Sequence, residues 1–167
     1  MVVNARTVET ERDTFAALDL GYVALFLGLR VNQLVMERMR ARGFAEVRES
    51  HGYVIQHLIE QDRSITELAR RMEVTQQAAS KAVRELAAIG VIELVRGEDR
   101  RAKTVKVSQR GWTVVRLGRR TRRQLEGRLM RRVGTEKYES ARLILSECLA
   151  ALGGVERIRA RRVLAPQ

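Results

Sequence analysis

The sequence has very little cysteine and very little proline. The single cysteine, Cys148, cannot form a disulfide within the chain, which excludes a disulfide framework and fits a reducing cytoplasm. The single proline, Pro166, stands almost at the end of the chain, so no proline interrupts a helix before it. Because alanine, leucine, arginine and glutamate are abundant, this composition favours a mainly α-helical protein.

Long apolar runs are also missing. No uninterrupted run approaches the roughly 18 residues of a membrane-spanning helix. Charged residues from Arg6 to Asp13 break up any signal peptide near the start of the sequence. We therefore expect a cytoplasmic protein, built as one domain with extensions.

The motifs of common enzymes are absent. The sequence has no glycine-rich phosphate loop, no nucleophile elbow, no zinc-protease motif and no carboxylate pair placed to share a pocket. Its two histidines, His51 and His57, have no cysteine or carboxylate at metal-ligand spacing. We expect a protein that is not an enzyme and that uses neither a cofactor nor a metal.

Positive charge is plentiful. Lysine and arginine number 32 against 20 acidic residues, which gives a formal net charge of +12. Such a balance predicts an anionic partner, which could be nucleic acid, an acidic membrane surface or an acidic protein. A membrane is disfavoured because the arginine-rich segment has few large apolar or aromatic residues.

Two heptad-like apolar stripes predict long helices that pack against a partner. The first runs through residues 15–39, with Asn32 as a polar interruption, and the second through residues 138–152. A small domain cannot cover this much apolar surface by itself, so we expect a homodimer. The stripe residues are Phe15, Leu18, Tyr22, Leu25, Leu29, Asn32, Met36 and Met39, then Tyr138, Ala141, Leu145, Cys148 and Leu152.

The middle of the sequence predicts a helix-turn-helix. After a helix over about 45–61, Ser64 and Glu67 form a capping box for a short helix, and Thr75 is an N-cap for the next, which ends before Gly90. One face of this last helix is apolar and the other is polar and cationic, with chemistry suited to base edges and phosphates. We expect DNA contacts from Thr75, Gln76, Gln77, Ser80, Lys81 and Arg84.

A basic hairpin follows the helix pair. Apolar residues recur every second position over residues 91–95 and 104–107, which indicates two strands joined by a polar loop that contains glycine. Such a tip can follow the DNA backbone or reach the minor groove, where arginine is favoured. We expect Asp99 to pair with a neighbouring arginine. The expected contacts are Arg96, Asp99, Arg100, Arg101 and Lys103.

Four short segments resemble the MarR (multiple-antibiotic-resistance regulator) family of winged helix-turn-helix transcriptional regulators. They are Glu67-Leu68-Ala69, Val74-Thr75-Gln76-Gln77-Ala78, Leu86-Ala87-Ala88-Ile89-Gly90 and Asp99-Arg100-Arg101-Ala102-Lys103. The resemblance covers nearly the whole chain and implies a dimer whose paired recognition helices and wings bind a pseudo-palindromic site. The resemblance also implies a wing ion pair between Asp99 and Arg101, with Arg101 as the minor-groove arginine. The chain departs from the family at Arg96-Gly97, where an aspartate-proline pair often opens the wing.

These observations predict a mainly α fold with a small β-hairpin wing, a dimeric winged helix-turn-helix. Residues 1–44 would form an arm and a dimerisation helix, residues 45–108 the DNA-binding lobe, and residues 109–167 a long connecting helix and a second dimerisation helix. The predicted function is that of a sequence-specific DNA-binding transcription regulator. The resemblance implies a repressor, because repression is the commoner role in the family. The alternative is a sequence-indifferent basic protein that binds nucleic acid or organises the chromosome.

Two further residues have competing interpretations. His51 is a candidate for lining an effector pocket, in which the family resemblance implies a small anionic aromatic ligand, but a hydrogen-bonded core histidine is the favoured interpretation. Cys148 could sense oxidants, but its place on an apolar stripe favours an inert side chain.

Overall fold

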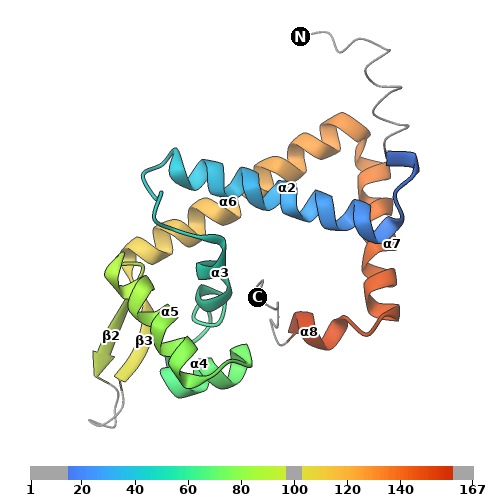
Figure 1. The fold of residues 1–167 in the computed structure, drawn as a ribbon. Helices are drawn as coiled ribbons and strands as arrows, with labels where there is room; N and C mark the ends of the chain where they lie inside the picture. Colours follow the sequence, from blue (N-terminus) through green and yellow to red (C-terminus); the bar gives the residue numbers. More distant parts are fainter. Residues whose placement is uncertain (1–14, 97–102, 160–167) are drawn as a thin grey trace. The chain divides into compact units, whose positions relative to one another are not determined.

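Figure 1 shows the chain as a computed structural model, which describes residues 15–96 and 103–159. The chain divides into two compact units, residues 1–34 and residues 35–167. The division falls within helix α2 (Leu20–Arg40). The predicted fold class is confirmed, because the described chain is mostly helical with one small antiparallel sheet.

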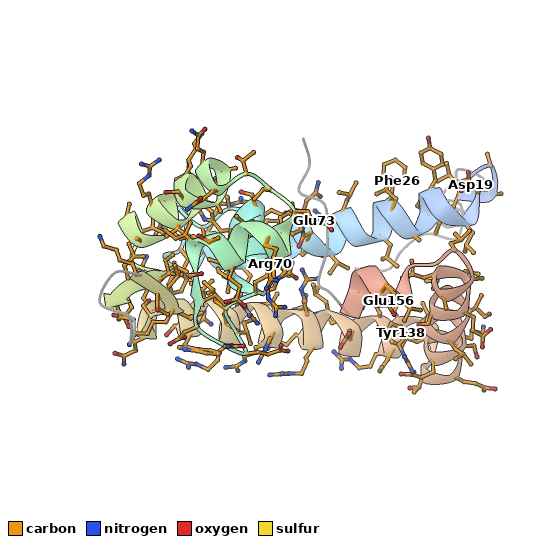
Figure 2. The ribbon with its side chains drawn as sticks, turned by 90° about the horizontal axis from the view of Figure 1, so that it is seen from below. Asp19, Phe26, Arg70, Glu73, Tyr138 and Glu156 are labelled. Carbon is orange, nitrogen blue, oxygen red and sulfur yellow. The ribbon has the colours of Figure 1, made fainter. Side chains whose placement is uncertain are left out.

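The first unit contains the beginning of α2. This helix starts at Leu20, later than the apolar stripe from Phe15 predicted, because the Asp19 carboxylate accepts a hydrogen bond from the Tyr22 amide (3.0 Å) and so caps the helix. The rings of Tyr22 and Phe26 stack with centroids 6.2 Å apart. Both rings remain more than half exposed, and Phe26 projects from the helix in Figure 2.

The second unit begins with the end of α2 and continues into α3 (Glu49–Ile55), β1 (Arg63–Ser64), α4 (Ile65–Met72) and α5 (Gln76–Ala88). Helix α3 is shorter than the predicted helix over 45–61. Its last turn tightens, since the His57 and Leu58 amides donate to the carbonyls of Val54 and Ile55. The chain then turns so that the Arg63 side chain donates from Nε to the His57 carbonyl (2.7 Å).

The sheet has the order β1-β3-β2 and is antiparallel throughout. The predicted hairpin is confirmed as β2 (Ile92–Arg96) and β3 (Lys103–Val107), with Arg96 opposite Lys103. Strand β1 was not predicted, because two residues are too few to show an alternating pattern. It pairs with β3 and places the start of α4 beside the base of the hairpin.

The core of the second unit lies between α5, the sheet and α6 (Gln109–Val133). Its most deeply buried side chains have essentially no exposed surface, and each comes from a different element or connection: Leu68, Leu86, Val91 and Val105. Val114 and Val115 of α6 belong to the same cluster. Apolar burial of this kind is the main stabilising contribution to the lobe.

Helix α6 is joined to the lobe by Ser108. The Ser108 hydroxyl accepts a hydrogen bond from the Gly111 amide (2.9 Å) and donates one to the Gly90 carbonyl (2.6 Å). One side chain thereby caps α6 and ties it to the end of α5.

Helix α7 (Thr135–Ala151) and the short α8 (Val155–Arg159) complete the second unit. No residue of α7 is buried in the single chain. Cys148 is half-buried on this helix. Its large exposed apolar side chains are Leu143, Ile144 and Leu149, followed at the end of the helix by Leu152.

Candidate nucleic-acid interface

The turn between α4 and α5 is formed by three residues with defined roles. Glu73 ends α4 in the left-handed conformation (φ 57°), and Arg70 and Glu73 mark this end in Figure 2. The Val74 amide donates to the Ala69 carbonyl (3.0 Å), which closes the last turn of α4. Thr75 then caps α5, because its hydroxyl accepts a hydrogen bond from the Ala78 amide (3.1 Å). This turn fixes the angle at which α5 leaves α4.

Helix α5 has one buried face and one exposed face. Ala79, Val83 and Leu86 are buried against the core. Because the helix repeats every 3.6 residues, Gln76, Gln77, Lys81 and Arg84 turn outward. All six residues predicted to contact DNA line a surface hollow of about 730 Å³, together with Ile65 and Ala78: Thr75, Gln76, Gln77, Ser80, Lys81 and Arg84.

The charge of this hollow is positive. Lys81 and Arg84 are exposed cations, and none of the described residues that line the hollow is acidic. The nearest acid along the helix, Glu85, is engaged elsewhere, since the Arg48 guanidinium donates to its carboxylate. A carboxylate that faced DNA phosphates would repel them, so this ion pair keeps α5 compatible with a polyanion.

One side chain of the hollow is held by the preceding helix. The Gln76 amide nitrogen donates to the Thr66 hydroxyl (3.3 Å), so the start of α5 is tied to α4 by a side-chain hydrogen bond as well as by the turn. The glutamine oxygen remains available as an acceptor.

The two strands of the hairpin are joined by side chains as well as by the backbone. An ion pair joins Lys106 and Glu93 across β3 and β2 (3.3 Å). Lys103 is exposed where β3 begins, and Arg96 is the last residue of β2. The predicted contacts Asp99, Arg100 and Arg101, and the predicted pairing of Asp99 with an arginine, lie outside the described residues.

Arg63 has a structural role that sequence reasoning missed. Its side chain is 6% exposed, and its guanidinium pairs with the Glu67 carboxylate as well as with the His57 carbonyl. Arg71 also approaches Glu67 (3.4 Å). The four-residue spacing of Arg63 and Glu67 was the available signal, but it carried no indication that the arginine would be buried.

His51 is 3% exposed on α3. Its Nδ1 accepts a hydrogen bond from the Arg48 backbone amide (3.2 Å), and its Nε2 lies 3.9 Å from the Glu85 carboxylate. These contacts are those of a hydrogen-bonded core histidine next to α5. Burial lowers the pKa of His51 below its usual 6.5, and the Arg48 charge lowers it further, whereas Glu85 opposes the change.

The lowered pKa of His51 predicts that the fold weakens in mild acid. Between the folded and unfolded pKa values the unfolded chain binds more protons, so the free energy of unfolding falls as the pH drops below about 6.5. Urea unfolding of the wild type and of His51→Gln from about pH 5 to about pH 7 measures this effect. The slope against pH should be shallower in the variant, and equal slopes would contradict the assignment.

The described residues contain neither a metal-binding cluster nor a membrane-spanning helix. No group of three or more histidine, cysteine, aspartate or glutamate side chains could hold a metal ion within residues 15–96 and 103–159. Over the same described ranges, no helix combines the length and the apolar character needed to cross a bilayer.

A helix pair joined by a short turn, preceded by a short strand and followed by a two-stranded hairpin that pairs with it, defines a winged helix-turn-helix protein. Residues 48–102 match the family model described as "MarR family". Among the curated proteins, none matches the chain.

Solved structures match over most of the chain. The YusO protein of Bacillus subtilis has a TM-score of 0.64 at 20% identity, covering 89% of this chain and 99% of YusO. A MepR mutant of Staphylococcus aureus bound to an oligodeoxyribonucleotide has a TM-score of 0.61 at 16% identity, covering 81% and 99%. Apo MarR of E. coli has a TM-score of 0.58 at 16% identity, covering 79% and 98%.

The resemblance to the MarR family is thus confirmed. Residues 48–102 match the model of this family, and the fold of the chain is that of these solved structures.

Proposed function

We propose that the protein is a sequence-specific DNA-binding transcription regulator that acts as a homodimer on a pseudo-palindromic operator, and that it represses. The observation that carries the proposal is the exposed face of α5. Glutamine, serine, lysine and arginine side chains line one hollow there, and a short turn and two caps hold the helix against α4. The MepR mutant bound to an oligodeoxyribonucleotide, which shares the fold, supports the same partner.

In this proposal the helix and the hairpin have different roles. A helix of this kind enters the major groove, where glutamine, lysine and arginine can bind base edges. The hairpin continues from Arg96 and Lys103 and would position the protein through Arg100 and Arg101, with Asp99 pairing with an arginine. The lobe over residues 45–108 then contains both DNA-contacting elements.

Footprinting of the intergenic DNA beside the coding region tests this proposal. A two-fold dimer should protect two half-sites about one helical turn apart, roughly 34–36 Å along one face of the duplex. Even protection along the whole fragment would contradict the regulator and favour a sequence-indifferent chromosome-organising protein. Reporter expression from the protected promoter, measured with and without the regulator, then tests repression.

The homodimer is supported by apolar surface that the single chain leaves uncovered. Leu25 on the α2 stripe is about half exposed, and Leu152 at the end of the α7 stripe is 87% exposed. Exposed apolar surface on each helix favours a protein interface, and burying it against a second copy would stabilise the assembly.

Adding a charge to the stripe on α7 should therefore weaken the dimer. Ala141 lies on the predicted stripe, and Ala150 lies on another side of the same exposed helix. Ala141→Glu should raise the dimer dissociation constant by about tenfold or more, because it buries a carboxylate in an apolar interface. Sedimentation equilibrium measures this constant, and Ala150→Glu is the matched control. Equal dissociation constants for the two variants would show that this face of α7 does not lie in the interface.

A small anionic aromatic effector, with His51 as a lining residue, completes the proposal. His51 lies next to Glu85 of α5, so a ligand that displaced these contacts would disturb the DNA-reading helix. Addition of benzoate as a probe should lower operator affinity in the wild type and have a smaller effect in His51→Gln. An unchanged operator affinity in the wild type would contradict release by this class of ligand.

A further inference from the structure

Helix α6 has an unusual charge for a helix that packs against a core. Its 25 residues include nine arginines and a single acid, Glu126. The buried residues Gly111, Val114, Val115 and Thr121 occupy one side of the helix. At 3.6 residues per turn, the opposite side presents five arginines, which we call the α6 arginine stripe: Arg116, Arg119, Arg120, Arg123 and Arg131.

Within residues 15–96 and 103–159, no acidic side chain neutralises the stripe. All five arginines are exposed, and none forms an ion pair with an acidic side chain in the part of the chain that the structure describes. Among the contacts of the described residues, Arg116 alone of the five donates a side-chain hydrogen bond, to the neutral hydroxyl of Thr113 (3.1 Å). Adjacent like charges repel one another, so this arrangement favours a bound polyanion.

A small hollow lies along one flank of the stripe, within the second unit. Arg120 and Gln124 of α6 line it together with Arg38 and Arg42 from the end of α2 and its following turn. Its volume is about 30 Å³. A hollow of this size has room for a small group such as a phosphate oxygen.

The stripe and the recognition face of α5 point in different directions. In Figure 2, long side chains that end in nitrogen project from α6 on the side turned away from α4 and α5. The face of α5 described above lies on the other side of the lobe's core, which separates the two helices. A duplex seated on α5 therefore leaves the stripe uncovered.

We infer that the α6 arginine stripe is a second DNA-binding surface, which holds the phosphate backbone of a duplex segment other than the one read by α5. Guanidinium groups bind phosphate oxygens in a bidentate manner and without regard to sequence. From residue 116 to residue 131 the helix rises about 22 Å, a length over which one DNA strand passes about six phosphates. The large apolar side chains on this side, Trp112 and Met130, are half-buried, which disfavours a membrane as the occupant.

This surface would let one dimer hold two DNA segments, as in looping or wrapping around an operator. The inference rests on the proposed function, because the first segment is the operator held by α5. The stripe itself needs no base recognition, so its contribution should be independent of sequence and sensitive to salt.

A two-duplex capture experiment tests the inference. Operator DNA defined by the footprint is immobilised and saturated with the full-length protein, and the loaded protein is quantified. A labelled duplex of scrambled sequence is then added at near-physiological salt. The wild type should capture the second duplex, whereas Arg120→Gln/Arg123→Gln should lose at least about 90% of this capture, as expected for a tenfold loss of affinity. The matched control is Arg128→Gln/Arg132→Gln, which removes the same charge from other sides of the same helix.

Each outcome has a definite meaning. Loading of the operator with loss of capture only in the stripe variant supports the second surface. Equal capture by both variants, or no capture by the loaded wild type, overturns the second surface. If the wild type then bound vesicles of anionic lipid, the stripe would be assigned to a membrane. Failure to load the operator is a separate result, because it contradicts the proposed function at the first step.

Discussion

Replacing Gly111 with alanine is expected to destabilise the winged-helix lobe by about 4 kcal/mol or more, an effect at the upper end for a single substitution. A β-carbon at residue 111 would lie 2.0 Å from the Val91 carbonyl oxygen and 2.8 Å from a methyl group of Val107. The obstructing oxygen belongs to the backbone and accepts a hydrogen bond from the Ser108 amide (3.1 Å), so it cannot move aside without breaking the junction between α6 and the strands. Urea unfolding followed by circular dichroism measures the loss.

The same helix provides a control for this substitution. A β-carbon at Gly127 would meet nothing closer than a flexible arginine nitrogen at 3.5 Å. Gly127→Ala should therefore stabilise α6 by about 0.5–1 kcal/mol, because alanine loses less conformational freedom in a helix. If Gly111→Ala were as stable as Gly127→Ala, that result would contradict the close approach of residue 111 of α6 to the Val91 carbonyl.

Replacing both Lys81 and Arg84 with alanine is expected to weaken operator binding by roughly a hundredfold. Both are exposed on the α5 face, and neither contributes to the core, so the fold and the dimer should persist. The lost phosphate contacts should also reduce the slope of log affinity against log salt, by about 0.9 for each contact.

Fluorescence anisotropy with the footprinted duplex measures this loss. A charge-matched variant is the control for the change in net charge. Arg128→Ala/Arg132→Ala removes the same net charge from α6, away from the α5 hollow. This control should bind within about threefold of the wild type, since general electrostatic steering is a smaller contribution than direct contact. A comparable loss in both variants would mean that net charge, not the face of α5, determines affinity.

The sequence predicted most of the winged helix because its signals were local. Ser64 and Thr75 were each expected to cap a helix, and each hydroxyl accepts the expected amide hydrogen bond. The change of period after Gly90 located the hairpin to within about one residue at each end. These features depend on residues three or four positions apart, which the order of the sequence shows directly.

Features that depend on distant residues were missed. Helix α3 is shorter than its apolar spacing suggested, because the chain must turn to bring Arg63 to β3. The ion pair of Arg48 and Glu85 joins residues 37 positions apart. No periodicity reveals such pairs, although they hold α5 in place and leave its exposed face free of negative charge.

The outward direction of the α5 side chains could be predicted, but their common hollow could not. Spacing placed Ser80 and Arg84 on one face with Gln76 and Gln77. Only the packing of α4 beside α5 added Ile65 to this surface and engaged Gln76 with Thr66. The sequence therefore predicted the candidate contacts, and the structure supplied the surface that they share.

The most direct test of the central claim is the ratio of two affinities at one near-physiological salt concentration. The dissociation constant of the wild-type dimer is measured for the footprinted duplex and for a scrambled duplex of the same length and composition. A regulator that reads bases with α5 should bind its own site at least about 1000-fold more tightly than the scrambled duplex. Equal affinities would contradict the account and leave a basic protein that binds DNA without regard to sequence.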